Sequence, residues 1–254
     1  MSECYGRFAD LYDKLMDDVD YDRWADSVAE LIRQYAGPEK GLSVLDCACG
    51  TGEISFRLAG YGYSVTGADL SEDMLRIAQE KARRHGVQIP FVRMDMRQLR
   101  LHRKVRVITC CCDGVNYLTD TKSVREFFLS AAENLEKDGL LLFDLSTPYK
   151  LEYVLGCGQM GEDREDCTYL WENLYDPESG LLEMRLHFFV PENGRSDRWI
   201  RFDETHIQRS YDTDTVKRLL EECGFTMLSA TDAGTGKEPA PDCQRIQYAA
   251  RRNQ

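Results

Sequence analysis

Apolar residues follow two spacings in residues 41–148. Short runs of strand length alternate with longer segments in which apolar residues recur every three or four positions, as in an amphipathic helix. Helices are expected from about Gly52, from near Ser71 and over 120–137. Ser71 is of a residue type that caps the start of a helix, and Gly86 is of the type that ends one. The expected strands are 43–47, 63–68, 89–93, 105–112 and 140–145. Strands that alternate with helices predict a parallel sheet with helices on both faces.

The first 40 residues have helical spacing throughout. Phe8 and Leu11 belong to one apolar stripe and Trp24 to a second, which Gly37 and Pro38 end. Two helices are therefore expected before the first strand.

The pattern changes after Pro148. Three runs typical of antiparallel strands follow, joined by segments rich in turn-forming residues. The three runs cover 168–175, 181–190 and 197–208. A helix over 212–223 and strands near 225–231 and 244–250 are expected after them.

Together these elements predict an α/β fold, with a doubly wound, mostly parallel seven-stranded sheet and an inserted antiparallel β lid. The expected parts are N-terminal helices in 1–40, a core in 41–148 and 211–254, and the lid in 149–210. We expect the lid over the carboxyl edge of the sheet, where open α/β sheets bind ligands.

Composition narrows the class of protein. The chain has 254 residues, 43% hydrophobic and 30% charged, which is typical of a globular protein with one large core. Its formal net charge of -12 opposes a nucleic-acid partner, because phosphate contacts need clustered Lys and Arg. With neither a secretory leader pattern nor a run of about 18 apolar residues, no membrane partner and a cytoplasmic location are expected. The oligomeric state stays open, a homodimer included.

The ten cysteines are interpreted as reduced thiols that fill core space. Cys110, Cys111 and Cys112 are consecutive in an apolar strand-like run. A zinc site built on Cys47 and Cys49 is the alternative, but the chain contains no Cys-x-x-Cys pair. No metal is therefore expected.

The motif that points to a ligand stands at the end of the first expected strand, where residues 44–52 read Val-Leu-Asp-Cys-Ala-Cys-Gly-Thr-Gly. Gly50 and Gly52 lack side chains where the backbone must turn sharply and a ligand must approach it closely. Asp69 ends the next strand, where a carboxylate can accept both hydroxyls of a ribose. Strand, glycine pair, helix, strand and acid in this order predict a nucleoside-containing ligand.

A nicotinamide dinucleotide is the rival ligand. Its motif needs a third glycine, and this chain has Ser55 there. Asp46, directly before the loop, would repel a pyrophosphate, whereas it suits a cofactor that carries an amino group and a sulfonium charge.

These motifs, followed by Arg-Met-Asp-Met at 93–96, resemble the cofactor motifs of class I (Rossmann-like) S-adenosylmethionine-dependent methyltransferases. The resemblance covers about the first 150 residues. It implies that the loop from Asp46 to Gly52 wraps the methionine part and that Asp69 holds the ribose. It further implies cofactor contacts from Cys47, Ala48, Gly50, Leu70, Met74, Asp95, Met96 and Cys111.

Two further segments resemble small-molecule methyltransferases of this class. The opening segments around Tyr12 and Tyr21 are similar to helices that close over the cofactor, although the residues alone favour two core tyrosines. The β insertion that ends at 203–211 looks like the lid of amino-sugar N-methyltransferases and of uncharacterised relatives. The resemblance therefore implies a small, enclosed acceptor.

Methyl transfer is a direct displacement, so alignment and water exclusion matter most and a general base helps. His206 is the first candidate base, with Glu204 on the same face of its strand; a histidine held by its neighbouring carboxylate is the alternative. Asp113 and Asn116 follow the fourth strand, where they face the reacting atoms or cap a helix. The Asn/Asp-Pro-Pro-Tyr/Phe signature of nucleic-acid base methyltransferases is absent from this stretch.

The sequence thus predicts methyl transfer from S-adenosylmethionine to N or O of a small-molecule acceptor. Two alternatives remain, a regulator that binds the cofactor without turnover and a nicotinamide-dependent oxidoreductase.

Overall fold

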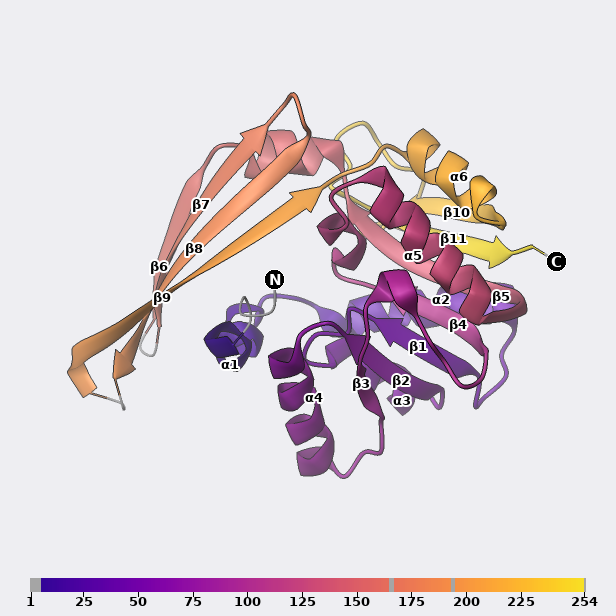
Figure 1. Ribbon diagram of the computed structural model, residues 1–254, viewed down its shortest axis with the longest axis horizontal. Helices are drawn as coiled ribbons and strands as arrows, with labels where there is room; N and C mark the ends of the chain where they lie inside the picture. The colour runs from indigo at the N-terminus through magenta and orange to yellow at the C-terminus, as the bar shows by residue number, and fades with distance from the viewer. Residues whose placement is uncertain (1–5, 165–166, 193–194, 254) are drawn as a thin grey trace.

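The computed structural model describes residues 6–164, 167–192 and 195–253, and two β-sheets organise them (Figure 1). The larger sheet has seven strands, as predicted, in the order β10-β11-β5-β4-β1-β2-β3. Its strands are β1 (Ser43–Cys47), β2 (Ser64–Asp69), β3 (Phe91–Arg93), β4 (Val105–Cys110), β5 (Leu135–Ser146), β10 (Phe225–Asp232) and β11 (Arg245–Arg252). Strands β1 to β5 pair in parallel, while β11 pairs antiparallel with both β5 and β10. The order reverses between β1 and β4, where open α/β sheets bind ligands.

Helices cover both faces of this sheet. Successive side chains of a strand point to opposite faces, and here both sets are apolar, so each face needs a covering layer. Leu140 and Leu142 pack with α2 (Tyr21–Ala36), α3 (Glu53–Gly60) and α4 (Glu72–His85). Their neighbours Leu141 and Phe143 pack on the opposite face with α5 (Thr121–Asn134) and α6 (Thr213–Glu222). The predicted doubly wound architecture is confirmed.

Polar residues of the expected types set the helix ends. Ser71 Oγ accepts a hydrogen bond from the backbone N–H of Met74 at 3.3 Å, and Gly86 ends α4 with a φ of 66°. The α5 helix stops at Asn134, earlier than predicted, because β5 begins at once and Leu135 already pairs with Val105 of β4. No helix in the described ranges is long and apolar enough to cross a membrane.

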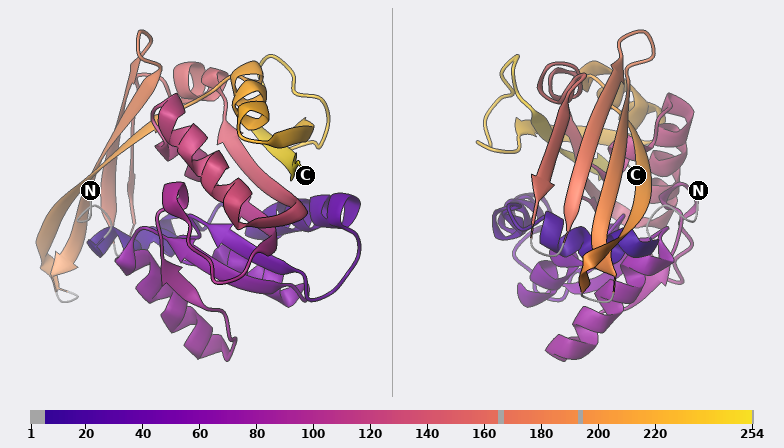
Figure 2. Two further views of the ribbon diagram at one scale, coloured as in Figure 1. Left: turned by 45° about the vertical axis from the view of Figure 1, so that its right-hand side comes forward. Right: turned by 90° about the vertical axis from the view of Figure 1, so that its left-hand side faces the viewer.

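The second sheet is antiparallel and forms an arm beside the core (Figures 1 and 2). Its strands are β6 (Gln159–Asp163), β7 (Thr168–Asp176), β8 (Leu181–Glu192) and β9 (Arg195–Arg209), preceded by the single-turn helix η3 (Lys150–Leu155). The sequence pattern predicts only three of these strands. It misses β6 because all five of its residues are exposed, so no apolar alternation marks the strand.

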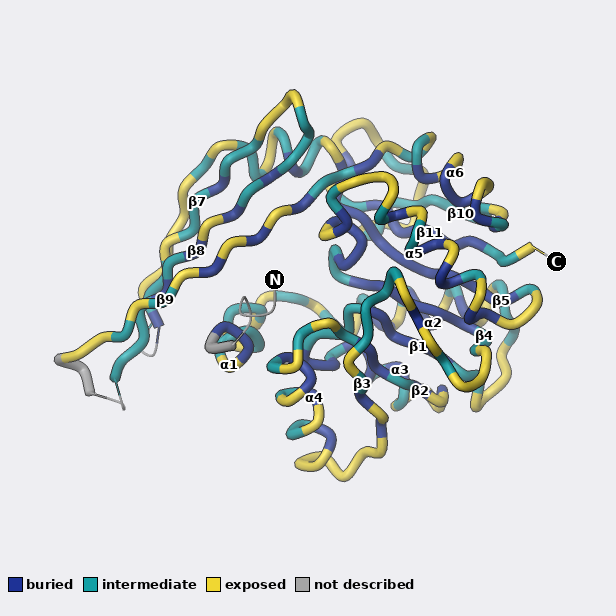
Figure 3. The backbone as a smooth tube through the Cα atoms, viewed as in Figure 1, coloured by how far each residue is buried: buried dark blue, intermediate teal, exposed yellow. Residues whose placement is uncertain are grey.

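Helix α1 (Gly6–Leu15) connects the arm to the core. Inner-face residues alternate with half-buried ones along most of β8 and with exposed ones along 203–208 of β9 (Figure 3). Phe8 of α1 packs against Phe188 of β8, with ring centroids 5.5 Å apart. Met74 of α4 belongs to the same apolar cluster, so the arm rests on the core through these side chains.

Candidate cofactor site

The loop that follows β1 has an unusual backbone. Ala48, Gly50 and Gly52 have φ values of 52°, 53° and 87°, in the left-handed region that favours glycine. A Cβ added to Gly52 would lie 3.0 Å from the rings of both Phe56 and Phe91, whereas one at Gly50 would meet nothing within 4 Å. The loop is therefore packed tightly below Gly52 and open beside Gly50, which leaves the backbone there accessible to a ligand.

Asp46 lies under this loop, at the point where the strand order reverses. Its side chain is buried, and it accepts hydrogen bonds from Ser55 Oγ at 2.6 Å and Thr109 Oγ1 at 2.8 Å. Burial raises the pKa of Asp46 to about 6, although both hydroxyl groups oppose the shift. No sequence pattern marks either partner as a ligand of Asp46, and Thr109 is recognised only from its pairing opposite Asp46 across β1 and β4.

Asp69 is fixed by backbone groups. Its carboxylate accepts the N–H of Gly50 at 2.8 Å and the N–H of Ser71 at 2.8 Å. Burial raises its pKa, and these N–H donors act against the shift. The ends of β1 and β2 are neighbours because Cys47 pairs with Ala68. Asp69 therefore lies directly beside the glycine loop.

A small cavity of about 50 Å³ opens between this loop and the N-terminal helices. Six residues singled out in the sequence line it: Tyr12, Tyr21, Asp46, Ala48, Gly50 and Cys111. Cys49 and Thr51, within the loop expected to wrap the methionine part, also line it, together with Glu53, Ile54 and Cys112, which were not predicted as contacts. The structure therefore brings together the loop and the helices that the sequence analysis assigned to one site.

Two tyrosines roof this cavity. The hydroxyl groups of Tyr12 and Tyr21 interact by a hydrogen bond, and burial raises the pKa of both. Cys111 lies below them, and burial keeps its thiol protonated by raising its pKa well above the usual range. The thiol of Cys111 is thus an inert part of the wall.

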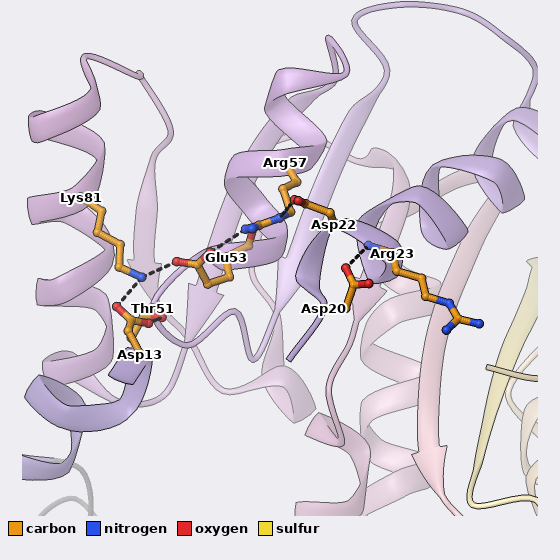
Figure 4. Close-up of polar contacts among 8 residues, drawn as sticks. All are labelled: Asp13, Asp20, Asp22, Arg23, Thr51, Glu53, Arg57 and Lys81. Atoms are coloured by element: carbon orange, nitrogen blue, oxygen red, sulfur yellow. Dashed lines mark hydrogen bonds and ion pairs between the residues drawn. The ribbon is translucent and has the colours of Figure 1, made fainter. Parts of the chain in front are cut away.

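Ion pairs hold α1 and α2 against the core around the cavity (Figure 4). Lys81 of α4 contacts Asp13 of α1 at 2.5 Å and Glu53 of α3 at 2.6 Å. Thr51 Oγ1 also donates to Asp13 at 2.6 Å. Burial acts to raise the pKa of Glu53, but hydrogen bonds from Lys81 and Arg57 lower it overall. These contacts fix the position of α1 beside the glycine loop.

The remaining residues expected to contact the cofactor do not line this cavity. Cys47 is buried in the sheet core, Met74 is buried under the arm, and Leu70 is 48% exposed. The pKa of Asp95 is lowered by hydrogen bonds from Arg97, to which it is paired at 2.6 Å, while Met96 packs on the core. Their cofactor contacts stay predictions.

His206 and Glu204 are both buried on the inner face of β9. The Nδ1 atom of His206 lies 3.4 Å from the hydroxyl of Tyr117, and its ring lies 5.5 Å from that of Phe8. Burial lowers the pKa of His206 to about 4, so its imidazole is neutral and a weak base near pH 7.

Asp113 and Asn116 have different surroundings. Asp113, with a φ of 66°, pairs with Arg245 at 2.5 Å and accepts a hydrogen bond from Ser146 Oγ at 2.6 Å. Asn116 is fully buried; its Nδ2 donates to the carbonyl of Arg209 at 2.8 Å, and its Oδ1 accepts from the N–H of Ser146 at 3.0 Å. Asn116 thus ties the end of β9 to the end of β5.

Among the described residues, no group of three or more His, Cys, Asp or Glu side chains is arranged to hold a metal ion. The site is built instead from a glycine loop, the buried carboxylate of Asp46, the half-buried carboxylate of Asp69 and a roof of two tyrosine rings. A buried anion at Asp46, beside an open backbone at Gly50, fits a cofactor with cationic groups better than a pyrophosphate.

Comparisons with known proteins agree with this geometry. The family model described as "Methyltransferase domain" matches residues 44–139. A putative methyltransferase of Geobacillus sp. (strain WCH70) is 38% identical over 98% of this chain and 99% of its own length. A dTDP-3-amino-3,4,6-trideoxy-alpha-D-glucopyranose N,N-dimethyltransferase of Streptomyces venezuelae is 30% identical over 78% of this chain and 81% of its own length.

Solved structures extend the similarity to the whole fold. DesVI of Streptomyces venezuelae has a TM-score of 0.76 at 23% identity, covers 96% of this chain and 97% of its own, and shares the fold. The S-adenosylmethionine-dependent methyltransferase from Clostridium acetobutylicum ATCC 824 has a TM-score of 0.85 at 31% identity, over 99% of this chain and 100% of its own. The chain therefore belongs to the S-adenosylmethionine-dependent methyltransferase family, and S-adenosylmethionine is its cofactor.

Proposed function

We propose that this protein transfers a methyl group from S-adenosylmethionine to N or O of a small-molecule acceptor. The observation that carries the proposal is the cavity that joins Asp46 and the glycine loop to the roof of Tyr12 and Tyr21. A site that joins cofactor-binding groups to covering helices can align reactants, which is most of what a direct methyl displacement needs.

Relatives support both kinds of acceptor atom. They include the Streptomyces venezuelae N,N-dimethyltransferase that acts on an amino sugar nucleotide and a ubiquinone biosynthesis O-methyltransferase of Rickettsia canadensis (strain McKiel). Nucleic acid is disfavoured as acceptor by the net charge of -12. The buried, protonated thiols of Cys110 and Cys111 fit the reducing cytoplasm, which we propose as the compartment.

The bound cofactor supplies an electrophilic methyl group, and the chain holds it in place. In this proposal the carboxylate of Asp46 accepts a hydrogen bond from the amino group, and the open backbone at Gly50 lies along the methionine part. The carboxylate of Asp69 accepts hydrogen bonds from the ribose hydroxyl groups. Asp95 and Met96 flank the adenine, with Leu70 and Met74 at the edge of that pocket.

The first experiment is isothermal titration of the purified protein with S-adenosylmethionine, with NADH as the comparison ligand. Binding of S-adenosylmethionine alone is the expected result. Binding of NADH alone would overturn the roles given to Asp46 and Asp69.

A second experiment separates an enzyme from a regulator that only senses the cofactor. An enzyme releases S-adenosylhomocysteine when an acceptor is added, whereas a sensor binds S-adenosylmethionine and releases none with any acceptor. Mass spectrometry of the reaction mixture detects the product directly.

His206 stays our candidate for a base on the lid side. Its pKa of about 4 requires that it act from the neutral state across the neutral pH range. Rate profiles between pH 5 and 9 for the wild type and His206→Asn should therefore differ in height. Coinciding profiles would remove His206 as a base.

A further inference from the structure

The turn after β4 forms part of the wall of the cofactor cavity, the small cavity beside the glycine loop. Cys112 of this turn lines the cavity, and Gly114 packs so closely on the glycine loop that an added Cβ would lie 3.0 Å from the Cβ of Ala48. Cys112 and Asp113 both have left-handed backbones, with φ values of 58° and 66°. This conformation is unfavourable for residues other than glycine, so the surrounding structure must hold it.

Side chains of β5 and β11 hold this turn at Asp113. Arg245 of β11 pairs with the Asp113 carboxylate at 2.5 Å, and Ser146 Oγ of β5 donates to the same carboxylate at 2.6 Å. Asp144 of β5 accepts a hydrogen bond from the backbone N–H of Asp113 at 3.3 Å. Arg245 also pairs with Asp144 at 3.0 Å, so its guanidinium joins the side chain of the turn to the strand that supports the backbone of the turn.

The forked guanidinium of Arg245 matches this arrangement. Its Nη2 contacts the carboxylate of Asp113 and its Nη1 contacts that of Asp144, two ends of a planar group that is always charged. Asp144 is 1% exposed, and burial raises its pKa to about 7; Arg245 acts against this shift and Asp113 adds to it. Without Arg245 the two carboxylates would repel each other, and the turn would move away from β5.

Arg245 also contacts the helix that covers the cavity. Its guanidinium lies 5.0 Å from the centre of the Trp24 ring of α2, a cation–π contact. Tyr21, one turn earlier in α2, lines the cofactor cavity. One side chain of β11 therefore contacts both the turn after β4 and α2, two of the elements that line the cavity.

We propose, building on the proposed function, that Arg245 is a positioning residue for S-adenosylmethionine, which it serves without touching it. Arg245 holds the turn after β4 and helix α2 where the bound cofactor needs them. Because the left-handed turn is already fixed, the cofactor does not have to impose it, and affinity is higher by the free energy saved. Loss of Arg245 therefore weakens cofactor binding in protein that is still folded.

Calorimetric titration with S-adenosylmethionine, at a temperature where every variant is folded, tests this role. Arg245→Met should weaken binding about tenfold, the size expected from backbone strain that is no longer supported. Arg245→Lys keeps the charge without the fork and should recover part of the affinity. Arg252→Met is the matched control on the same strand: it removes a hydrogen bond to the carbonyl of Leu135, so stability should fall and affinity should not change. Wild-type affinity in Arg245→Met, or equal losses in Arg245→Met and Arg252→Met, overturns the proposal.

A double-mutant cycle tests whether Arg245 acts through the turn. Asp113→Asn removes the ion pair but keeps a residue type that tolerates the left-handed backbone, and it should weaken binding about fivefold. The double variant with Arg245→Met should lose only about tenfold, whereas independent effects would multiply to about 50-fold. A loss equal to the product overturns the proposal. If Arg245→Met does not fold, Arg245→Lys and Asp113→Asn decide, and unchanged affinity in both has the same meaning.

Failure of the proposed function has a different signature. If the wild type does not bind S-adenosylmethionine, or if Asp69→Ala binds it as tightly as the wild type, the cofactor does not occupy this cavity and both proposals fall. If Asp69→Ala weakens binding while Arg245→Met does not, the proposed site stands and only the role of Arg245 is overturned.

Discussion

The glycine-loop site and the inner face of the arm hold their polar side chains in different ways. Asp69 is fixed by backbone N–H groups of Gly50 and Ser71, which lie within 20 residues of it in the chain. His206 is surrounded instead by Phe8 and Tyr117, side chains from elements remote in sequence.

The two kinds of support differ in how easily cofactor affinity and acceptor choice can be changed by substitution. Backbone hydrogen bonds persist when neighbouring side chains change, so the cofactor site tolerates variation around it. Side-chain packing on the arm changes with each substitution. We therefore expect changes on the arm to alter turnover and acceptor choice, and changes around Asp69 to alter cofactor affinity.

The substitution with the strongest predicted consequence is at Asn116, which connects the two regions by hydrogen bonds. Asn116→Ala removes a buried side chain that bonds backbone groups of both β5 and β9 and leaves those groups unsatisfied. The free energy of unfolding should fall by about 3 kcal/mol, measured by urea denaturation. A loss below about 1 kcal/mol would show that the two regions are joined by other contacts.

Asp69→Ala and His206→Asn together test the comparison directly. Asp69→Ala should weaken S-adenosylmethionine binding about 30-fold, or about 2 kcal/mol, because the ribose loses its acceptor and two N–H groups lose theirs. His206→Asn should leave this affinity unchanged in the same calorimetric titration. Equal losses in both variants would contradict the separation of roles.

Asp46→Asn tests whether the buried carboxylate of Asp46 lowers stability while it supports cofactor binding. The pKa of Asp46 is about 6 in the folded state, above its ordinary value of 3.8. Its contribution to stability is therefore full below pH 3.8 and is lost as pH rises through 6. The variant without cofactor should be about 2 kcal/mol more stable than the wild type at pH 7, with a flatter stability profile between pH 4 and 6. Its binding of S-adenosylmethionine should nevertheless weaken.

The smallest effect concerns His206. Burial lowers its folded pKa to about 4, below the ordinary value of 6.5, so its contribution is present above pH 6.5 and is lost as pH falls toward 4. Thermal unfolding should show a loss of about 1–2 kcal/mol between pH 7 and 5 that is absent in His206→Asn. Identical pH slopes would show that the imidazole titrates normally.

The sequence predicts those parts of the molecule whose determinants are local. Asp46, the glycine loop and Asp69 lie at the ends of consecutive strands, so spacing alone brings them together. Ser71 caps α4 within its own turn. Each of these signals depends on residues close in the chain, where periodicity and residue type suffice.

Other parts depend on pairing between distant segments. Thr109 meets Asp46 only because β4 pairs with β1, and Arg245 meets Asp144 only because β11 pairs antiparallel with β5. Strand β6 is held by hydrogen bonds to β7, although its own residues are all exposed. No pattern of residue spacing indicates which distant strands pair, so these contacts could not be predicted from the sequence.

Helix α1 touches three regions with ten residues. Phe8 packs under the arm, Tyr12 roofs the cofactor cavity, and Asp13 pairs with Lys81 of the core. A shift of this helix changes the cofactor cavity and the packing of the arm at once. Cofactor binding and the position of the arm are then thermodynamically linked, and whatever factor the cofactor imposes on the arm equilibrium, the position of the arm imposes on cofactor affinity in return.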